Sequence, residues 1–394
     1  MRRRPGRLAH SARPVPRARL PRLLGGAALV LAAVGAVSAG GACGSGGSSG
    51  SSGGGSGSSG SGSGGSGAAP LTAEPEGPTG ELVHAIDRKF TQSFGRGDLA
   101  VGGGWIYWIE RSRGGSAVVR RKPAAHLAAE PEDIAGPGPV SAIAADAEQL
   151  YLAGDGLTAR PHAAGSPHIA GSPHAAGSPH ASAAAAPIAS GAWLEIVPGA
   201  RHLLVRSRDQ IALVAKRGGA LETVWTGKHG KLSVDADGDG FVAIPVSPWS
   251  TQRSTARPIT FYAPGAPPAV IAQLPDARGD LSVDGGWIYV GGRAPDGAAA
   301  SPLWRLPRAG GSPERVGDPA WGFGDFLVRQ GILYGMVATG GAWKLQKLAL
   351  APGARPAAAP VVLDARVPPA LQALTLDATH VYYLTDSEVR RAPR

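Results

Sequence analysis

The sequence predicts an all-β fold, a β-propeller built from four-stranded blades. Two observations lead to this prediction. A strand pair recurs along residues 80–394 at intervals of roughly 35–55 residues, and further strands follow it in several copies. Almost no part of this region shows the 3.6-residue apolar periodicity of a helix.

The recurring unit is a short alternating strand, a turn of Asp, Gly or Ala residues, and an apolar strand that contains Tyr. Residues 99–109 read LAVGGGWIYWI and residues 281–290 read LSVDGGWIYV; residues 143–152 and 374–384 repeat the pattern. Looser copies also occur. The units therefore start near residues 99, 142, 196, 231, 281, 325 and 373.

A third strand follows the Tyr-containing strand in several units, and an apolar fourth strand comes after small residues such as those at 310–312. The seventh unit stops at Arg394 after three strands. We expect residues 80–86 (GELVHAI) to supply its fourth strand and close the ring, which removes an exposed sheet edge. Seven blades result. Six or eight also fit, because the units near 196 and 231 are degenerate.

Four segments resemble those of a known class of repeat. They are residues 106–110 (IYWIE), 303–307 (LWRLP), 381–386 (VYYLTD) and 389–393 (VRRAP). They resemble the YWTD class of propellers and other secreted bacterial propellers with VYW…VxRxP…GGxP units. The resemblance covers about 300 residues and implies the fold. Propellers of this kind bind, scaffold and sometimes catalyse, so the fold does not decide the function.

Residues 1–42 are predicted to be a signal peptide. A basic, Pro-rich stretch precedes the mostly apolar segment Leu23–Ala39, and small residues follow. This segment is at the lower limit of length for a membrane span, and no basic flank directly follows it. We therefore expect a removed signal rather than a transmembrane anchor.

Cys43 follows small residues directly after this apolar segment, an arrangement that resembles the lipobox of bacterial lipoproteins. The resemblance implies acylation of Cys43, although Gly40 stands where the family usually has Leu. The alternative is ordinary signal cleavage after Ala39 or Ala42. Under the lipoprotein interpretation, residues 43–79 are the lipid-attachment site and a disordered tether, because residues 44–67 are Gly and Ser throughout.

Charge and cysteine content exclude several function classes. The formal charge of +10 arises largely from eight Arg residues before Cys43, and the rest of the chain has 31 basic and 29 acidic residues. A nucleic-acid-binding domain is more basic than this. With Cys43 as the single cysteine, intrachain disulfides and Cys-based zinc sites are excluded.

Two segments contain metal-binding residue types. Asp235, Asp237 and Asp239 have the spacing of a calcium loop, but later ligands are missing, and the favoured interpretation is an ordinary turn between strands. The sequence repeats a hexapeptide that places His162, His168, His174 and His180 six residues apart. We expect residues 161–187 to be a low-complexity surface loop rather than a metal site.

Aromatic and basic side chains in the repeats have structural interpretations. Trp105, Trp108, Trp287 and Trp304 could bind a sugar, but aromatic residues at repeated strand positions usually pack between blades. Arg120, Arg305 and Arg390 on the third strands are predicted to lie on solvated strand faces.

The function predicted from these observations is a noncatalytic, monomeric and exported cell-envelope lipoprotein of a Gram-negative bacterium. It would lie in the outer membrane or face the periplasm, with the cell surface as a further location. It would attach to the membrane through Cys43, and its propeller would bind a protein, peptide or glycan. No catalytic constellation appears and no cofactor is expected, with calcium at Asp235, Asp237 and Asp239 as the alternative. The alternative is a propeller enzyme, a lyase or hydrolase with its site at the channel mouth. The inner strands are poor in His, Asp and Glu, which favours binding.

Overall fold

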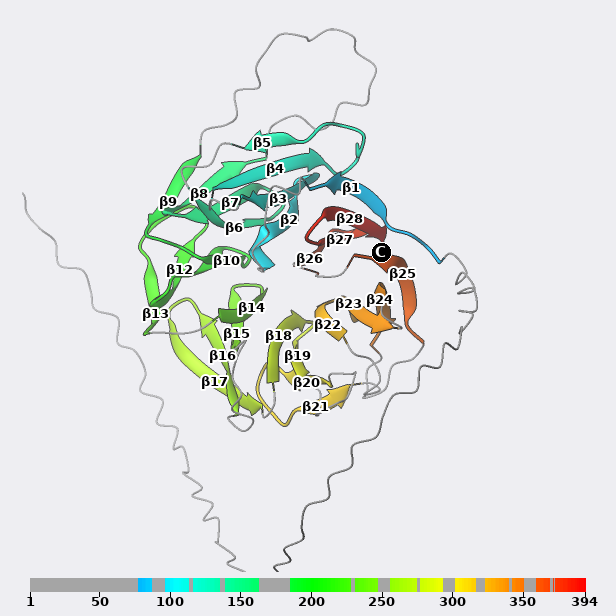
Figure 1. Cartoon of the computed structure of the whole chain (residues 1–394). Coiled ribbons are helices and arrows are strands. Elements are labelled where there is room, and N and C mark those ends of the chain that lie inside the picture. The colour runs from blue at the N-terminus through cyan, green and yellow to red at the C-terminus, as the bar shows by residue number, and fades with distance from the viewer. Residues whose placement is uncertain are drawn as a thin grey trace, which may run out of the picture. The chain divides into compact units, whose positions relative to one another are not determined.

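Seven four-stranded antiparallel sheets stand in a ring (Figure 1). The computed structural model describes residues 77–86, 96–112, 116–134, 139–162, 185–227, 231–246, 256–274, 277–292, 302–316, 323–339, 342–350, 359–368, 371 and 373–394. Backbone contacts divide the chain into Met1–Pro70 and Leu71–Arg394, and all described residues belong to the second unit. The predicted all-β propeller with seven four-stranded blades is confirmed.

Within each blade the strands are ordered from the ring axis outward. The innermost strands are β2 (Leu99–Gly102), β6 (Val140–Ala145), β10 (Glu195–Pro198), β14 (Lys231–Asp237), β18 (Ala277–Asp284), β22 (Phe323–Arg329) and β26 (Ala373–Leu376). The second strands are β3 (Trp105–Arg111), β7 (Gln149–Gly154), β11 (His202–Arg206), β15 (Gly240–Val246), β19 (Trp287–Gly292), β23 (Ile332–Thr339) and β27 (His380–Leu384). The third strands are β4 (Ala117–Pro123), β8 (Gly156–Pro161), β12 (Gln210–Ala215), β16 (Arg257–Ala263), β20 (Leu303–Pro307), β24 (Ala342–Ala349) and β28 (Glu388–Pro393). The outer strands are β5 (Glu132–Ile134), β9 (Ala186–Ser190), β13 (Glu222–Thr226), β17 (Ala266–Leu274), β21 (Glu314–Val316), β25 (Val361–Val367) and β1 (Glu81–Ala85).

The first two strands of each blade form a hairpin, and the unit starts expected from the sequence coincide with the seven innermost strands. A short 3₁₀ turn, η1 (Arg96–Asp98), precedes β2. In the first and fifth blades the hairpin turn is Gly-Gly: Gly103 and Gly285 have φ of 57°, and Gly104 and Gly286 have φ of 80°. Two consecutive residues at positive φ match the twist of the paired strands, and other residue types adopt this conformation only with strain.

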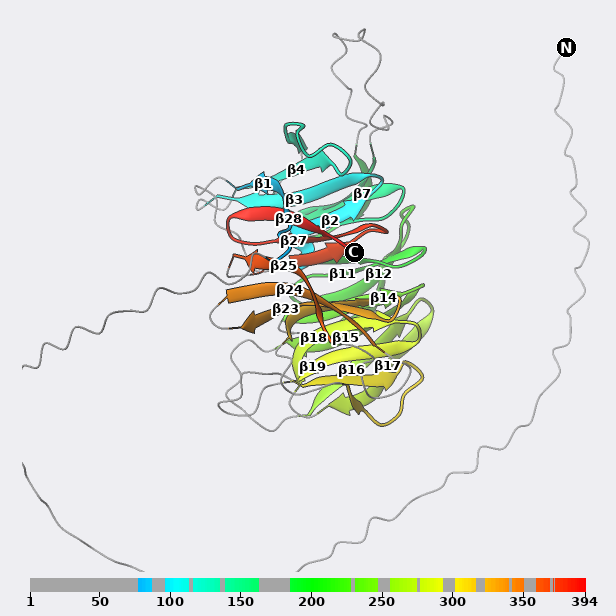
Figure 2. The same cartoon turned by 90° about the vertical axis from the view of Figure 1, so that its right-hand side faces the viewer.

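Strand β1 comes from the N-terminal side of the ring and completes the last blade. It pairs antiparallel with β28, with Glu81 opposite Arg391 and Leu82 opposite Arg390, and the register shifts at Val83. Val83 and Ile86 are buried, whereas Leu82 is 49% exposed. The predicted closing strand is therefore confirmed. Figure 2 shows β1 beside β28 at the edge of the same blade.

Charged side chains also hold β1 in place. Arg390 Nη2 donates to the carbonyl of Gly80 at 2.6 Å, and Arg391 pairs with Glu81 at 2.6 Å. From the next blade, Lys122 Nζ donates to the carbonyl of Val83 at 2.8 Å. Burial lowers the pKa of Lys122. The closing strand is thus bound by its own blade and by its neighbour.

Aromatic residues pack within and between the blades. Trp108 is buried with Val83, Leu99 and Tyr382, which belong to the first and last blades. Trp105 is buried between the first two blades, and Trp287 and Trp304 pack as half-buried residues against neighbouring clusters. The interpretation of these tryptophans as packing residues agrees with the structure.

The prediction that third-strand arginines lie on solvated faces is wrong. Arg305 is buried, donates to Glu314 at 2.8 and 3.0 Å, and stacks 4.5 Å from the centre of the Trp287 ring. Arg390 bonds Asp364, which is fully buried, on the preceding blade. Arg120 lies 3.1 Å from Asp133 and 3.6 Å from Glu110. Acidic partners explain why Arg305 is buried and why the side chains of Arg390 and Arg120 are only 15% and 25% exposed.

The segments predicted to direct export of the protein and to anchor it to the membrane lie outside the described residues. They are Leu23–Ala39, Cys43 and residues 44–67. Within the described ranges, no helix has the length and apolar character needed to cross a membrane. The signal peptide, the lipid anchor and the tether therefore stay predictions.

Removing β1 should destabilise the ring far more than removing the segment before it. Deleting residues 44–86 exposes the edge of β28 and the apolar surface that covers Val83 and Ile86. We expect a loss of at least about 3 kcal/mol, since burial of each such side chain contributes about 1.5–3 kcal/mol. The melting temperature should fall by roughly 6 °C or more. Deletion of residues 44–76 is the matched control and should change it little. Equal melting temperatures for the two deletions, measured by calorimetry, would contradict the role of β1.

Candidate functional site

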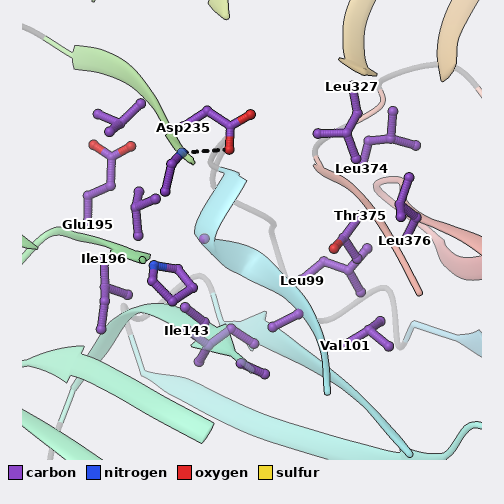
Figure 3. A pocket seen from close by; sticks show the side chains of 18 of the residues that line it. Leu99, Val101, Ile143, Glu195, Ile196, Asp235, Leu327, Leu374, Thr375 and Leu376 are labelled. Carbon is purple, nitrogen blue, oxygen red and sulfur yellow. Dashed lines mark hydrogen bonds between the residues drawn. The ribbon is translucent and has the colours of Figure 1, made fainter. Parts of the chain in front are cut away.

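A cavity of about 290 Å³ lies at the centre of the ring. Its described lining comes from the innermost strands of six blades and from Gly97 in η1. Figure 3 shows Glu195 and Ile196 on one side of the cavity and Leu327 and Leu374 on the other. The volume is near the lower limit of small-molecule sites, which span about 300–1,000 Å³. We call this cavity the channel site.

The wall of the channel site is aliphatic. Fifteen of the nineteen described lining residues are Gly, Ala, Val, Leu, Ile or Pro. None of the nineteen is aromatic, so the tryptophans considered for sugar binding are not among them. The four polar members are Glu195, Asp235, Arg329 and Thr375. This composition agrees with the inner strands being poor in ionisable residues.

Glu195 begins β10 and is held by the neighbouring strand. Arg206 Nε donates to its Oε2 at 2.7 Å, and the two side chains are 12–15% exposed. Register explains the pair, because Glu195 and Arg206 are opposite each other in the β10–β11 hairpin. No described residue donates a hydrogen bond to Oε1 of Glu195, so this oxygen can still accept one.

Asp235 is the most extensively bonded group at the site. Its Oδ1 accepts from the backbone N–H of Ala236 and from Arg329 Nη2, both at 2.9 Å. Its Oδ2 accepts from Ser282 Oγ at 3.1 Å, Val283 N–H at 2.8 Å and Arg329 Nη1 at 2.9 Å. Ser282 is fully buried. The carboxylate of the fourth blade is therefore bonded to the fifth and sixth blades.

The guanidinium of Arg329 is fixed in place and stays charged. Burial acts to lower the pKa of Arg329, but the negative charge and hydrogen bonds of Asp235 outweigh burial and raise it. Nη1 also donates to the carbonyl oxygens of Val328 and Val283. Nη2 makes one hydrogen bond to a described residue, which leaves its second hydrogen for another acceptor.

The other two residues of the predicted calcium loop point to different partners. Asp237 pairs with Arg308 at 2.6 Å in the fifth blade. Asp239 pairs with Arg201 at 2.6 Å in the third blade. Burial acts to raise the pKa of Asp239, but hydrogen bonds from Arg201 and His202 outweigh it and lower the pKa to about 2.

The calcium residues are thus separated rather than brought together. Residues 238–239 form the turn of the β14–β15 hairpin, which agrees with the interpretation of this segment as an ordinary turn between strands. Among the residues that the structure describes, no group of three His, Cys, Asp or Glu side chains could hold a metal ion. The calcium site stays a prediction without support from this geometry.

Asp146, in the turn between β6 and β7, links strands and blades through contacts that the sequence analysis did not predict. Asp146 accepts from two backbone N–H groups of its own turn, from Tyr151 OH at 2.7 Å and from Lys216 Nζ of the next blade at 2.6 Å. Asp377 binds its turn and Tyr382 OH in the same way. The recurring spacing of Asp and Tyr, five residues apart, could have predicted this contact.

The first histidine of the hexapeptide repeat belongs to the fold. His162 Nδ1 lies 2.7 Å from Tyr107 OH, and Nε2 lies 2.8 Å from the carbonyl oxygen of Asp146. The predicted bounds of the loop, 161–187, therefore overlap two strands, because Pro161 is the last residue of β8 and Ala186 is the first of β9. His168, His174 and His180 lie outside the described residues.

Comparisons with known proteins show the fold. No protein-family model and no curated protein matches the chain. Among solved structures, the tricorn protease matches with a TM-score of 0.52 and 13% identity, over 81% of this chain and 34% of that chain. The β-propeller domain of the Trilobed protease from Pyrococcus furiosus, described as having an open velcro topology, matches with a TM-score of 0.53 and 11% identity, over 77% and 96%.

A chain of the mitotic checkpoint complex is as similar in fold to this chain as the proteases are. Its TM-score is 0.54 at 11% identity, and the match covers 83% of this chain and 98% of that one. The chain described here is a β-propeller. It spans about a third of the tricorn protease chain, and identities this low carry the fold and nothing of the activity.

The Asp235–Arg329 pair should stabilise the ring independently of calcium. Asp235→Ala leaves Arg329 and Ser282 without their shared acceptor, and loss of one partner from a buried pair costs about 3–5 kcal/mol. Arg329 is 31% exposed, so we expect about 2–3 kcal/mol. Asp239→Ala is the comparison, with a smaller loss of about 1 kcal/mol, since Arg201 is 82% exposed. Urea unfolding with and without calcium measures both. A calcium-dependent gain in stability that both variants lose would establish a calcium site instead.

Asp146 should make stability depend on pH. Burial acts to raise its pKa, but hydrogen bonds from Lys216, Tyr151 and two backbone N–H groups outweigh burial and lower the pKa to about 2. A depressed pKa stabilises the folded chain above the unfolded value near 3.9 and loses this effect as pH falls toward 2. Asp146→Asn should cost about 2 kcal/mol at pH 7 and little near pH 2. Asp155→Asn, on an exposed turn, is the control. A deficit that is the same at both pH values would exclude ionisation of Asp146 as its cause.

Proposed function

We propose that this protein is an exported, lipid-anchored propeller that binds a protein or peptide at its channel site. The observation that supports binding rather than catalysis is the state of the channel's ionisable groups. Among the described lining residues, both carboxylates are engaged by arginines, Glu195 by Arg206 and Asp235 by Arg329. A general acid or base must exchange a proton with substrate, and groups locked in ion pairs are poorly suited to this role.

The composition of the wall narrows the ligand class. Glycan sites depend on aromatic stacking and dense polar contacts, and the described lining offers neither. Aliphatic walls with a few fixed polar groups suit apolar ligands. Of the three classes considered from the sequence, peptides and proteins fit this site better than glycans.

A second candidate is a hydrolase-type propeller. Two of the structural neighbours are proteases, the tricorn protease and the Trilobed protease. This candidate would require a catalytic group that reaches the channel from residues outside those described here. Peptide hydrolysis by the purified chain, abolished by changes at the channel mouth, would favour it over binding.

The anchor proposal rests on Cys43, which follows an apolar segment and precedes a Gly/Ser stretch. Cys43→Ala should move the protein from the membrane fraction to the soluble envelope fraction, because acylation would supply its hold on the membrane. Mass spectrometry of the mature N-terminus is the decisive measurement. A mature chain that begins at Gly40 and carries no acyl group would refute the lipoprotein proposal.

Binding is tested by capture from the native envelope. A photo-crosslinking amino acid at Thr375 in the channel should trap a partner peptide or protein. The same amino acid at Val270, which is 58% exposed on an outer strand, should not trap that partner. Identical crosslink patterns at the two positions would mean that the channel is not the binding site.

A further inference from the structure

The polar groups of the channel site are arranged so that one can accept and another can donate a hydrogen bond. Oε1 of Glu195 is held in position by the bond between Oε2 and Arg206 and takes no hydrogen bond from a described residue. Nη2 of Arg329 uses one hydrogen on Asp235. Both side chains line the same cavity. The lining of the cavity therefore includes one carboxylate oxygen that can accept a hydrogen bond and one guanidinium N–H that can donate one.

A peptide unit complements this pair, because each backbone residue carries one N–H donor and one C=O acceptor. The net charge of the site supports a neutral backbone over an ion. Glu195 is offset by Arg206, and Asp235 is offset by Arg329. A charged ligand would lose its hydration without gaining an uncompensated opposite charge in return.

The remaining wall determines which side chains can enter. Leu99, Ile143, Ile196, Leu327 and Leu374 surround the cavity from five blades (Figure 3). Small residues such as Ala144 and Ala236 leave space between them. Contact with such a wall favours aliphatic groups and disfavours polar side chains, which would be buried without hydrogen-bond partners.

We infer that the channel site binds a short peptide segment with aliphatic side chains, whose backbone N–H faces Glu195 and whose backbone C=O faces Arg329. This inference rests on the proposed binding function and names its ligand class. A cavity of about 290 Å³ limits the enclosed part to one or two residues of such a segment.

The test uses two labelled peptides and the full chain carrying Cys43→Ala, purified without detergent. The probe is a peptide with the sequence Gly-Ala-Val-Leu-Val-Ala-amide that carries fluorescein on its N-terminal amine, and its matched control is Gly-Ser-Thr-Asn-Thr-Ser-amide labelled in the same way. Fluorescence anisotropy should show that the aliphatic peptide binds at least about tenfold more tightly than the polar one, as expected when a few methyl groups are buried.

Thr375→Trp fills the channel from β26 and should weaken binding of the aliphatic peptide by about tenfold or more, because a side chain occupies the space the peptide needs. Val270→Trp adds the same side chain to an exposed outer strand and should change binding less than about twofold. Circular dichroism of both variants verifies that the propeller is folded. Should Thr375→Trp unfold the chain, Ala236→Leu is the milder channel-filling variant and should weaken binding in the same direction.

Three results would overturn the inference. Equal affinity for the two peptides would remove the aliphatic preference. Binding unaffected by Thr375→Trp and Ala236→Leu would place the peptide elsewhere. No binding of either peptide up to about 1 mM would exclude this ligand class. The last result, together with a crosslinked envelope partner at Thr375, would leave the binding function intact, whereas absence of both would remove the binding function itself.

Discussion

The pairing of β1 with β28 joins segments at the two ends of the described chain. Arg390 and Gly80, which bond across this pair, are 310 residues apart in the sequence. A ring of blades stays rigid only if each blade packs against two neighbours, and the last blade lacks its outer edge without β1. The same apolar cluster contains Val83 and Ile86 from β1 and Trp108 from the first blade. Closing the ring therefore also builds the contact between its first and last blades.

Charged pairs between blades add to this constraint in the second to sixth blades. Lys216 reaches Asp146, Arg308 reaches Asp237 and Arg329 reaches Asp235, each across at least one blade boundary. These pairs lie at or near the hairpin turns that end the innermost strands. A shift of these blades relative to one another would break the charged pairs. The pairs therefore keep the channel in its shape and its polar groups in their positions. A preformed channel is what the proposed binding function requires, since little ordering is then needed when a ligand enters.

Most of the fold was predictable from the sequence because short local patterns determine its hairpins. Leu-x-Val, a Gly-Gly or Asp-containing turn and a Tyr-containing strand recur in order, and each unit encodes its own hairpin. The closing strand was predictable from the number of strands in each unit, since the seventh unit lacks one strand and residues 80–86 are strand-like. Even the choice of Trp105 and Trp108 as packing residues followed from their repeated positions.

The site was predictable only in part, because its contacts depend on register between blades. Asp235 and Arg329 are 94 residues apart, and no local pattern shows that they meet across the fifth blade. Arg390 likewise meets Asp364 of the preceding blade, whereas Arg305 meets Glu314 on the next strand of its own blade. His162 was assigned to a low-complexity tract because the repeat dominates its surroundings, although its ring bonds two residues of the fold. The aliphatic nature of the channel, by contrast, was visible in the inner strands themselves.

Hydrogen exchange of the native protein at neutral pH, followed by mass spectrometry, tests the central role of ring closure most directly. If β1 is an integral part of the ring, the amides of Glu81–Ala85 that bond to β28 exchange as slowly as those of β27, because both are released only when the seventh blade opens. If instead Glu81–Ala85 exchanges rapidly while β26, β27 and β28 stay protected, the blade is stable without β1. That result would contradict the account of a ring closed by its N-terminal strand.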